Sequence, residues 1–136
     1  MMSSENLYDS YSKKYMEGND RLSIYHEYRM QTFKALLDKN FTLESLSVID
    51  YGCGDGVISQ FFGEGNLVGI DPSKEMVRLA QINHSKNEFM VGGLEQLQLA
   101  LSKRKFDLLV CLNTLPYMDE TELEHFSAIA SKYQIP

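Results

Sequence analysis

The sequence predicts an α/β fold in which a parallel sheet is flanked by helices. From residue 46 onward, short apolar runs bounded by turn residues alternate with segments of helical periodicity. Helical segments between strands favour crossover connections, which join parallel strands. The chain has 136 residues, 43% of them hydrophobic and 24% charged, which is the size and composition of one globular domain.

Each element is expected for a local reason. The strands are apolar runs that end at Gly, Asp or Asn, namely 46–51, 67–71, 88–91 and 106–112. The helices carry apolar residues at helical spacing, namely 57–62, 74–82, 94–101 and one from about residue 119. Asp119 is placed to cap that last helix, with Glu122 three residues on. Its buried face is predicted to hold Leu123, Phe126, Ala130 and Tyr133.

Residues 1–45 differ from the rest and are interpreted as a helical cap on an α/β domain of residues 46–136. Five of the eight tyrosines fall in this segment. A helix is predicted over 20–37 from its apolar spacing. Its buried side is expected to consist of Tyr25, Tyr28, Phe33, Leu36 and Leu37.

Charge and cysteine content narrow the class of protein. A net charge of -6 and a pI near 5.0 argue against a nucleic-acid partner. The sequence contains no apolar run of membrane-spanning length and no signal-peptide pattern at its start, so we expect a cytoplasmic protein without a membrane partner. Cys53 and Cys111 lie in apolar segments, which favours a reducing compartment. No Cys or His pair has metal-ligand spacing, so no metal is expected.

The most informative stretch is VIDYGCGDGVISQFF, residues 48–62, where a predicted strand runs into Gly52, Gly54 and Gly56 and then into a helix. Glycines there allow a tight turn and let a ligand approach the backbone without a Cβ in the way. The amides at the helix start can donate to an anionic group. A glycine-rich turn alone is weak evidence for a nucleotide site.

Position strengthens that evidence. Asp71 ends the next strand, 21 residues after Asp50, where a carboxylate can accept hydrogen bonds from both hydroxyls of a ribose. No structural role for Asp71 is evident from the sequence. The dinucleotide pattern G-x-G-x-x-G does not fit, because the third glycine comes one residue early. This spacing disfavours a nicotinamide-dependent dehydrogenase.

The chain resembles the class I S-adenosylmethionine-dependent methyltransferases of the small-molecule type. The resemblance rests on D-x-G-x-G-x-G at residues 50–56, on Ile70-Asp71-Pro72, on the helix SKEMVRLA and on the strand region FDLLVCLNTLPYM. The segment YDSYSKKY, residues 8–15, is similar to the opening of these enzymes. The resemblance implies a Rossmann-like sheet with strand order 3-2-1-4 for the part present, and methyl transfer from S-adenosylmethionine to a small molecule.

The resemblance also assigns residues to the methionine part of this cofactor. The backbone of Gly52, Cys53 and Gly54 would line it. Asn113, at the tip of the fourth strand, would meet the cofactor's amino group, and Tyr15 would close over the methionine end.

The nucleoside part of the cofactor falls to the next two strand tips. Asp71 would bind the ribose hydroxyls, and Pro72 and Met76 would pack against the adenine, although a plain core position is the favoured explanation of Met76. The edge of the adenine would be bordered by Gly92, Gly93 and Leu94.

The sequence departs from the family pattern at three points. Gly92 and Gly93 replace the acidic residue that receives the adenine amino group in many relatives, so backbone groups or water would serve instead. The link from Gly56 to Asp71 is short, which predicts a first helix clipped near residues 63–65. The segment NTLPY, residues 113–117, is not the Asn-Pro-Pro-Tyr of adenine amino-methyltransferases, which argues against a nucleic-acid base as substrate.

The reaction implied is an in-line displacement at the sulfonium methyl, in which the protein supplies alignment and desolvation. No catalytic residue can be named. Histidine is the usual side chain for a general base, and His26, His84 and His125 are the candidates, but none lies at a predicted strand tip.

The sequence supplies only four of the seven strands that the family builds. Three interpretations stay open: a fragment or truncated gene product, which we favour; a natural half that pairs with itself or a partner chain at the fourth-strand edge; and a non-catalytic cofactor-binding or assembly module. With the family's strand order, the fourth strand of this chain is expected to be a long apolar sheet edge.

Overall fold

A computed structural model describes residues 20–112 and 114–135, with the backbone alone at 20–26 and 116. The helices are α2 (Asp20–Asp38), α3 (Lys74–Asn83), α4 (Leu94–Lys103) and α5 (Glu120–Tyr133). The strands are β1 (Val48–Tyr51), β2 (Leu67–Asp71), β3 (Glu88–Val91) and β4 (Leu108–Val110). Short 3₁₀ helices span Leu43–Ser45, Val57–Phe61 and Leu115–Tyr117.

The four strands form one parallel sheet in the order β3-β2-β1-β4. This confirms the predicted fold class and strand order. Asp50 of β1 is in register with Gly69 of β2 and Val110 of β4, and Asp71 of β2 is in register with Val91 of β3. The carboxyl ends of all four strands therefore lie along one edge of the sheet.

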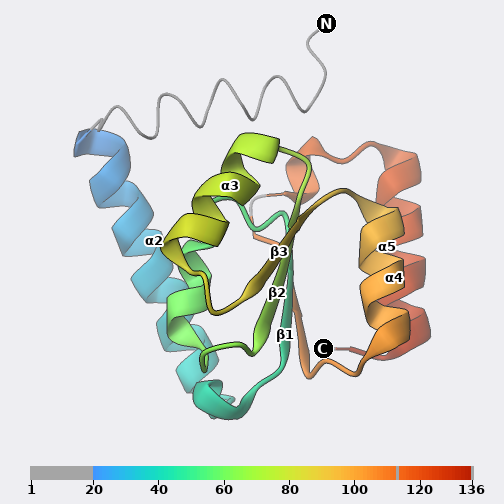
Figure 1. Cartoon of the computed structure of the whole chain (residues 1–136), viewed down its shortest axis with the longest axis horizontal. Coiled ribbons are helices and arrows are strands. Elements are labelled where there is room, and N and C mark those ends of the chain that lie inside the picture. The colour runs from blue at the N-terminus through green and yellow to red at the C-terminus, as the bar shows by residue number, and fades with distance from the viewer. Residues whose placement is uncertain (1–19, 113, 136) are drawn as a thin grey trace, which may run out of the picture.

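Helices cover both faces of the sheet, with α2 and α3 on one side and α4 and α5 on the other (Figure 1). The α2/α3 face encloses one apolar cluster, which includes Met30 and Leu37 of α2 and Val48 and Leu108 of the sheet. The opposite face encloses a second cluster, which includes Leu97 and Leu101 of α4, Ile49 and Ile70 of the sheet, and Ile129 of α5. The sheet is thus the middle of three layers.

The strands β2 and β3 have the predicted bounds, whereas β1 and β4 are shorter than expected, because only Val48–Tyr51 and Leu108–Val110 pair with neighbours. The expected helix over 57–62 is a single 3₁₀ segment, Val57–Phe61, and ends before Gly63 as the short link predicts. The helix α5 has the predicted cap, because the Asp119 carboxylate accepts from the Glu122 amide at 2.8 Å.

The predicted buried faces of two helices need correction. In α2, Leu37 is buried as predicted, but Tyr28 and Leu36 are 72% and 57% exposed, and Met30 is buried instead. In α5, Phe126 and Tyr133 pack against the core as predicted, whereas Leu123 is exposed and Ile129 is the buried residue of that face. Both helices carry apolar residues on more than one side, so the side that faces the sheet decides which of these residues are buried.

The structure was also searched for membrane-spanning helices and for disulfide bonds. In residues 20–112 and 114–135 no helix is long and apolar enough to span a membrane. Cys53 is a buried free thiol, and Cys111 is a half-buried one.

Candidate functional site

The turn after β1 presents its backbone to the carboxyl edge of the sheet. Gly52 and Gly54 have φ angles of 84° and 56°, a left-handed region that residues with a Cβ rarely adopt. The amides of Gly52 and Cys53 both donate to the Ile70 carbonyl of β2, at 2.7 and 3.0 Å. A Cβ on Gly54 would meet no described atom within 4 Å. The backbone at Gly54 is therefore open to a ligand.

Asp71 joins this turn to the start of α3. The residue is 3% exposed, and its carboxylate accepts from the Gly54 amide through Oδ2 and from the Ser73 amide through Oδ1, both at 2.9 Å. Asp71 thus has a structural role that the sequence did not reveal. Its place at a strand tip beside a glycine turn is also the place where α/β domains of this type bind a ribose.

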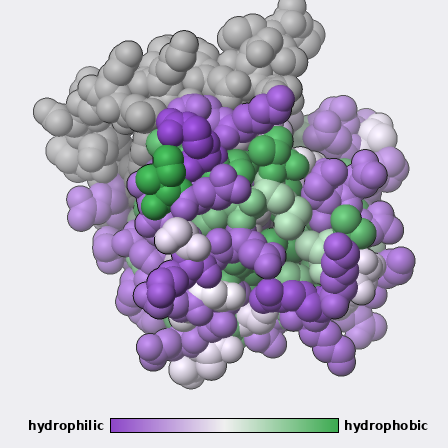
Figure 2. All heavy atoms as spheres, viewed as in Figure 1, coloured by the Kyte–Doolittle hydropathy of each residue, from purple (hydrophilic) through white to green (hydrophobic). Residues whose placement is uncertain are grey.

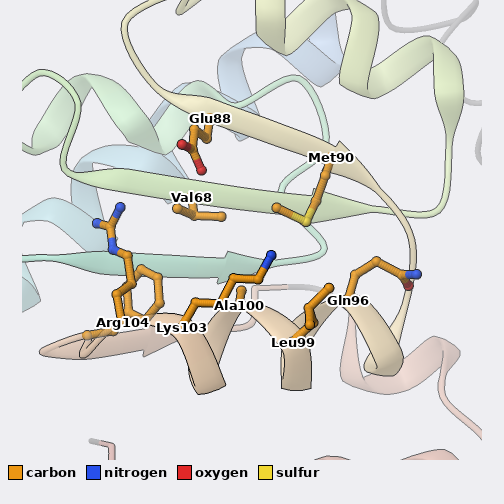
Figure 3. Close-up of a pocket in the computed structure, with 9 residues that line it drawn as sticks. Val68, Glu88, Met90, Gln96, Leu99, Ala100, Lys103 and Arg104 are labelled. Atoms are coloured by element: carbon orange, nitrogen blue, oxygen red, sulfur yellow. The ribbon is translucent and has the colours of Figure 1, made fainter.

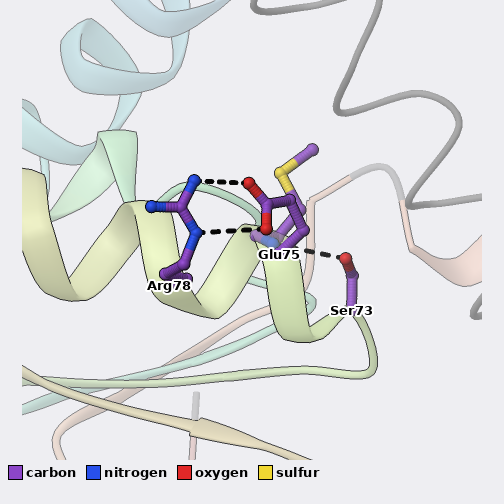
Figure 4. A network of polar contacts seen from close by, with 4 residues as sticks. Ser73, Glu75 and Arg78 are labelled. Atoms are coloured by element: carbon purple, nitrogen blue, oxygen red, sulfur yellow. Dashed lines mark hydrogen bonds and ion pairs between the residues drawn. The ribbon is translucent and has the colours of Figure 1, made fainter.

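The first turn of α3 is fixed by its own side chains (Figure 4). Ser73, which is fully buried, accepts from the Met76 amide through Oγ at 3.2 Å. Glu75 and Arg78 form an ion pair on the exposed side of the helix. Met76 is 6% exposed but belongs to neither apolar cluster of the described residues, and Pro72 is half-buried. The N-cap Ser73 therefore holds Pro72 and Met76 beside the end of β2.

The turn after β3 uses its glycine amides within the protein. The Gly92 amide donates to the Asp71 carbonyl at 3.0 Å, and the Gly93 amide donates to Gln96 Oε1 at 2.8 Å. The Gln96 side chain folds back onto Gly92, where a Cβ would overlap it. The backbone donors at this edge are thus the first amides of α4, from half-buried Leu94 onward, because the first amides of a helix have no intrahelical partner.

Ionisable groups beneath the glycine turn have strongly shifted pKa values. Burial, and after it the negative charge of Asp71, raises the pKa of Asp50 from 3.8 to about 8. Asp50 therefore carries a proton at neutral pH. Burial and the charge of Asp50 also raise the pKa of Cys53 well above its usual value, and that of Cys111 to about 11.

The strand order reverses between β1 and β4, and open α/β sheets bind ligands at such a switch point. Thr114, just after β4, packs directly on Gly52, where an added Cβ would lie 1.9 Å from its Oγ1. The same hydroxyl donates to the Leu112 carbonyl at 3.1 Å. The β4 tip and the glycine turn therefore form one contact at the switch point.

The structure brings most of the sequence-predicted site residues to one edge of the sheet, while Tyr15 and Asn113 lie outside the described residues. Sequence reasoning missed Asp50, Thr114 and Gln96 as members of this edge. A signal existed for Asp50, which is the one charged residue in the buried strand VIDY. Thr114 and Gln96 are recognisable only from their packing.

A cavity of about 130 Å³ lies elsewhere, between β2, β3 and α4. Figure 2 shows apolar residues on this face of the molecule, and Figure 3 shows Met90, Leu99 and Ala100 lining the cavity with Lys103 and Arg104. None of the predicted site residues lines it. A nucleotide ligand is better served by the glycine turn, where Gly54 leaves open space and the Asp71 carboxylate lies beside it at the strand tip.

The fold and the glycine turn together define a nucleotide-cofactor-binding α/β domain of the Rossmann type. The chain belongs to the methyltransferase domain family, whose model matches residues 48–133. The match runs from the first residue of β1 to the last residue of α5 and covers more than half of the chain.

Individual relatives agree with this assignment. The chain is 24% identical to the ubiquinone biosynthesis O-methyltransferase of Histophilus somni over 123 residues, which cover 83% of this chain and 51% of that protein. It is 35% identical to the malonyl-[acyl-carrier protein] O-methyltransferase of Pectobacterium atrosepticum over 57 residues, which cover 40% of this chain and 22% of that protein.

Solved structures give the same result. Magnesium protoporphyrin IX methyltransferase of Synechocystis PCC 6803 with bound SAM is 28% identical, with a TM-score of 0.64, and the match covers 81% of this chain and 55% of that one. The same enzyme with bound SAH matches with a TM-score of 0.63, over 79% of this chain and 52% of that one. The chain thus spans about half, or less, of the length of these relatives.

Proposed function

We propose that this chain binds S-adenosylmethionine along the carboxyl edge of its sheet and that the domain serves methyl transfer to a small molecule. One observation carries the proposal. The Gly54 backbone is open to a ligand and is tied to the buried Asp71 carboxylate, next to the switch point between β1 and β4. Family membership and the SAM-bound relative support the choice of cofactor.

The proposed cofactor extends from β1 toward β3. Its methionine part lies along the backbone of Gly52, Cys53 and Gly54. Its ribose hydroxyls donate to the Asp71 carboxylate. These hydrogen bonds add to, or replace, those that the carboxylate accepts from the Gly54 and Ser73 amides.

The adenine end of the cofactor is assigned to the next two turns. Pro72 and Met76 pack against the ring, and its edge faces the segment Gly92, Gly93 and Leu94. The amides of Gly92 and Gly93 already bond within the protein, so the first amides of α4 are the proposed adenine donors. We also propose that Asn113 meets the amino group of the cofactor and that Tyr15 closes over its methionine end.

S-adenosylmethionine supplies a methyl group on a sulfonium, whose thioether is a good leaving group. The tasks of the protein are to hold the cofactor in one orientation, to exclude water and to align the acceptor in line with the carbon–sulfur bond. The glycine turn and the Asp71 carboxylate that links it to Ser73 are assigned the first task. No side chain of the described residues is assigned as general base.

The proposed acceptor is a partly apolar small molecule rather than a nucleic acid. The net charge of -6 opposes phosphate binding. Leu115 and Tyr117, which follow β4, are 42% and 57% exposed and supply apolar surface near the switch point.

The two free thiols support the proposed cytoplasmic setting. We also propose that the β4 edge pairs with another strand, from a second copy of this chain or from a partner chain, because β4 has a described neighbour only in β1.

Calorimetric titration with S-adenosylmethionine and its demethylated product, S-adenosylhomocysteine, tests the proposed function. We expect saturable binding at one site, weakened by about 1 to 3 kcal/mol in Asp71→Ala, the scale for hydrogen bonds to a charged group. Glu124→Ala, on the exposed side of α5, is the matched control and is expected to bind as the wild type does. Absence of heat and of thermal stabilisation at millimolar ligand would refute cofactor binding.

A further inference from the structure

A side-chain carboxamide lies at the turn after β3, the turn that borders the adenine edge of the proposed cofactor. Gln96 Oε1 accepts from the Gly93 amide at 2.8 Å, and the side chain lies over Gly92. Figure 3 shows the carboxamide directed toward this turn rather than along the cavity. Gln96 is half-buried, so α4 holds a polar group at the carboxyl edge of the sheet.

The backbone fixes which way this carboxamide is turned. The Gly93 N–H is a donor and needs an acceptor, so it holds the oxygen of Gln96, and the Nε2 amino group lies on the other branch of the carboxamide. A half-turn of the group would set Nε2 against the Gly93 amide and leave both donors unpaired, which is costly. The carboxamide therefore offers an acceptor and a donor in a fixed order.

Only part of the hydrogen-bonding capacity of Gln96 is used within the protein. In the described part of the chain Nε2 has no hydrogen-bond partner, and Oε1 has a second lone pair. Capping of α4 accounts for the bond to the Gly93 amide, because a Gln three residues after the N-cap often closes a helix in this way. Capping leaves the donor Nε2 and one acceptor position of Oε1 for a ligand.

Gly93 leaves room for a ligand next to the carboxamide. A Cβ on Gly93 would meet a single described atom within 4 Å, the Tyr51 hydroxyl oxygen at 3.7 Å, which is an ordinary contact distance. Tyr51 is buried at the end of β1, and its ring packs against Phe126 of α5 with 5.5 Å between the ring centroids. The space at Gly93 thus accepts at least a methyl-sized group and has polar side chains of β1 and α4 beside it.

The fixed order of acceptor and donor matches adenine. One edge of adenine carries an amino donor next to a ring-nitrogen acceptor, and a Gln carboxamide pairs with these two groups through two parallel hydrogen bonds. Hypoxanthine has a carbonyl oxygen in place of the amino group, so its acceptor would face Gln96 Oε1. A freely turning carboxamide could reverse its order to suit hypoxanthine, whereas the bond to the Gly93 amide opposes that reversal.

We propose that Gln96 binds the amino-bearing edge of the adenine and makes the site selective for adenine over hypoxanthine. Oε1 accepts from the amino group of the base, and Nε2 donates to the neighbouring ring nitrogen. This inference rests on the proposed function and assigns the choice of base to one side chain of α4.

Calorimetry on the full chain tests this selectivity with S-adenosylhomocysteine and S-inosylhomocysteine, in which hypoxanthine replaces adenine. Contacts to the ribose and to the amino acid cancel in the ratio of the two affinities. In the wild type we expect a preference for adenine of about tenfold or more, the scale for a bidentate pair against the wrong base. In Gln96→Met, which keeps the length of the side chain without a carboxamide, the preference is expected to fall by about tenfold. Gln98→Met, at an exposed position of the same helix, is the matched control with the wild-type preference expected.

Two further variants separate the carboxamide from the helix cap. A Cβ at position 92 would overlap the Gln96 side chain, while φ of Gly92 lies outside the left-handed region, so Gly92→Ala is expected to fold and to displace the carboxamide. Its preference for adenine should fall although Gln96 is unchanged. Gln96→Glu keeps an acceptor for the Gly93 amide but lacks the donor, so its preference is expected between those of the wild type and Gln96→Met.

The outcomes distinguish this inference from the proposed function. If neither ligand binds the wild type, the proposed function itself is refuted. If S-adenosylhomocysteine binds and the wild type shows no preference for adenine, cofactor binding stands and the base selectivity is wrong. The selectivity is also wrong if Gln96→Met weakens both ligands by the same factor, because Gln96 then acts only through the cap. A thermal melt identifies a variant that does not fold, and Gln96→Glu, which keeps the cap, then decides the test: an unchanged preference would overturn the role of Nε2.

Discussion

Two carboxyl groups on neighbouring strand tips have different chemical states in this molecule. Asp71 accepts two backbone amides, which stabilise its charged form, whereas Asp50 has burial and a like charge against ionisation. Environments that shift the pKa values of neighbouring acids are typical of functional sites. At the scale of the residue, this difference is the main property of the site.

The raised pKa of Asp50 predicts that stability falls as pH rises. The unfolded chain releases this proton near pH 3.8, whereas the folded chain holds it to about pH 8, so the folded state binds more protons between these values. The contribution of Asp50 to stability is therefore complete below about pH 3.8 and is lost as pH rises toward 8. The loss is at most about 1.4 kcal/mol per pH unit.

Urea denaturation of the wild type and Asp50→Asn from pH 5 to pH 8 measures this effect. Since Asn cannot ionise, its stability relative to the wild type should increase steadily with pH, while other titrations cancel in the comparison. A difference in unfolding free energy that stays constant across this range would show that Asp50 is ionised in the folded protein.

At the scale of the element, the glycine turn makes different demands at its first two glycines. Alanine at either position must adopt a positive φ, at a cost of about 1 to 3 kcal/mol. At Gly52 it also collides with Thr114, whereas at Gly54 it meets no described atom. We therefore expect Gly52→Ala to be clearly less stable than Gly54→Ala.

Equilibrium unfolding ranks the two glycine variants, and ligand titration separates them further. Gly54→Ala should fold but bind S-adenosylhomocysteine poorly, because its methyl group occupies the open space above the turn. Equal stability of the two variants would contradict the Gly52–Thr114 contact. Undiminished binding by Gly54→Ala would contradict a ligand at that backbone position.

The elements were predictable from sequence where local chemistry decides them. The cap Asp119, the bounds of β2 and β3, and the clipped segment after Gly56 follow from residues close in the chain. The buried face of α2 follows only in part, because this helix carries apolar residues on more than one side. Leu37 is buried as predicted, whereas packing in the folded chain buries Met30 in place of Tyr28 and Leu36.

The site was predictable to a similar extent. Glycine spacing and the acid of the second strand locate the candidate site at the turn. The Asp71 bridge and the return of Gln96 onto Gly92 depend on which backbone groups the fold brings together, so no spacing in the sequence reveals them.

At the scale of the whole molecule, the two sheet edges differ in their protection. The β3 edge carries the exposed charge of Glu88, which discourages pairing with another strand, whereas β4 consists of Leu108, Leu109 and Val110. An uncharged edge strand favours pairing.

Sedimentation velocity over a range of concentrations tests pairing at the β4 edge. For the chain alone we expect the mass to rise from the 15.6 kDa monomer toward twice that value as concentration increases. A monomer at every concentration would contradict self-association through this edge and leave a partner chain as the proposed occupant.

The central claim is that the cofactor binds at the glycine turn, and nuclear magnetic resonance of the isotope-labelled chain tests it most directly. During titration with S-adenosylhomocysteine, we predict saturable shifts at the amides of Gly54, Ser73 and Leu94. The amides of Lys103 and Arg104, beside the cavity, should remain unchanged. Largest shifts at the cavity, or no shifts at millimolar ligand, would contradict the account.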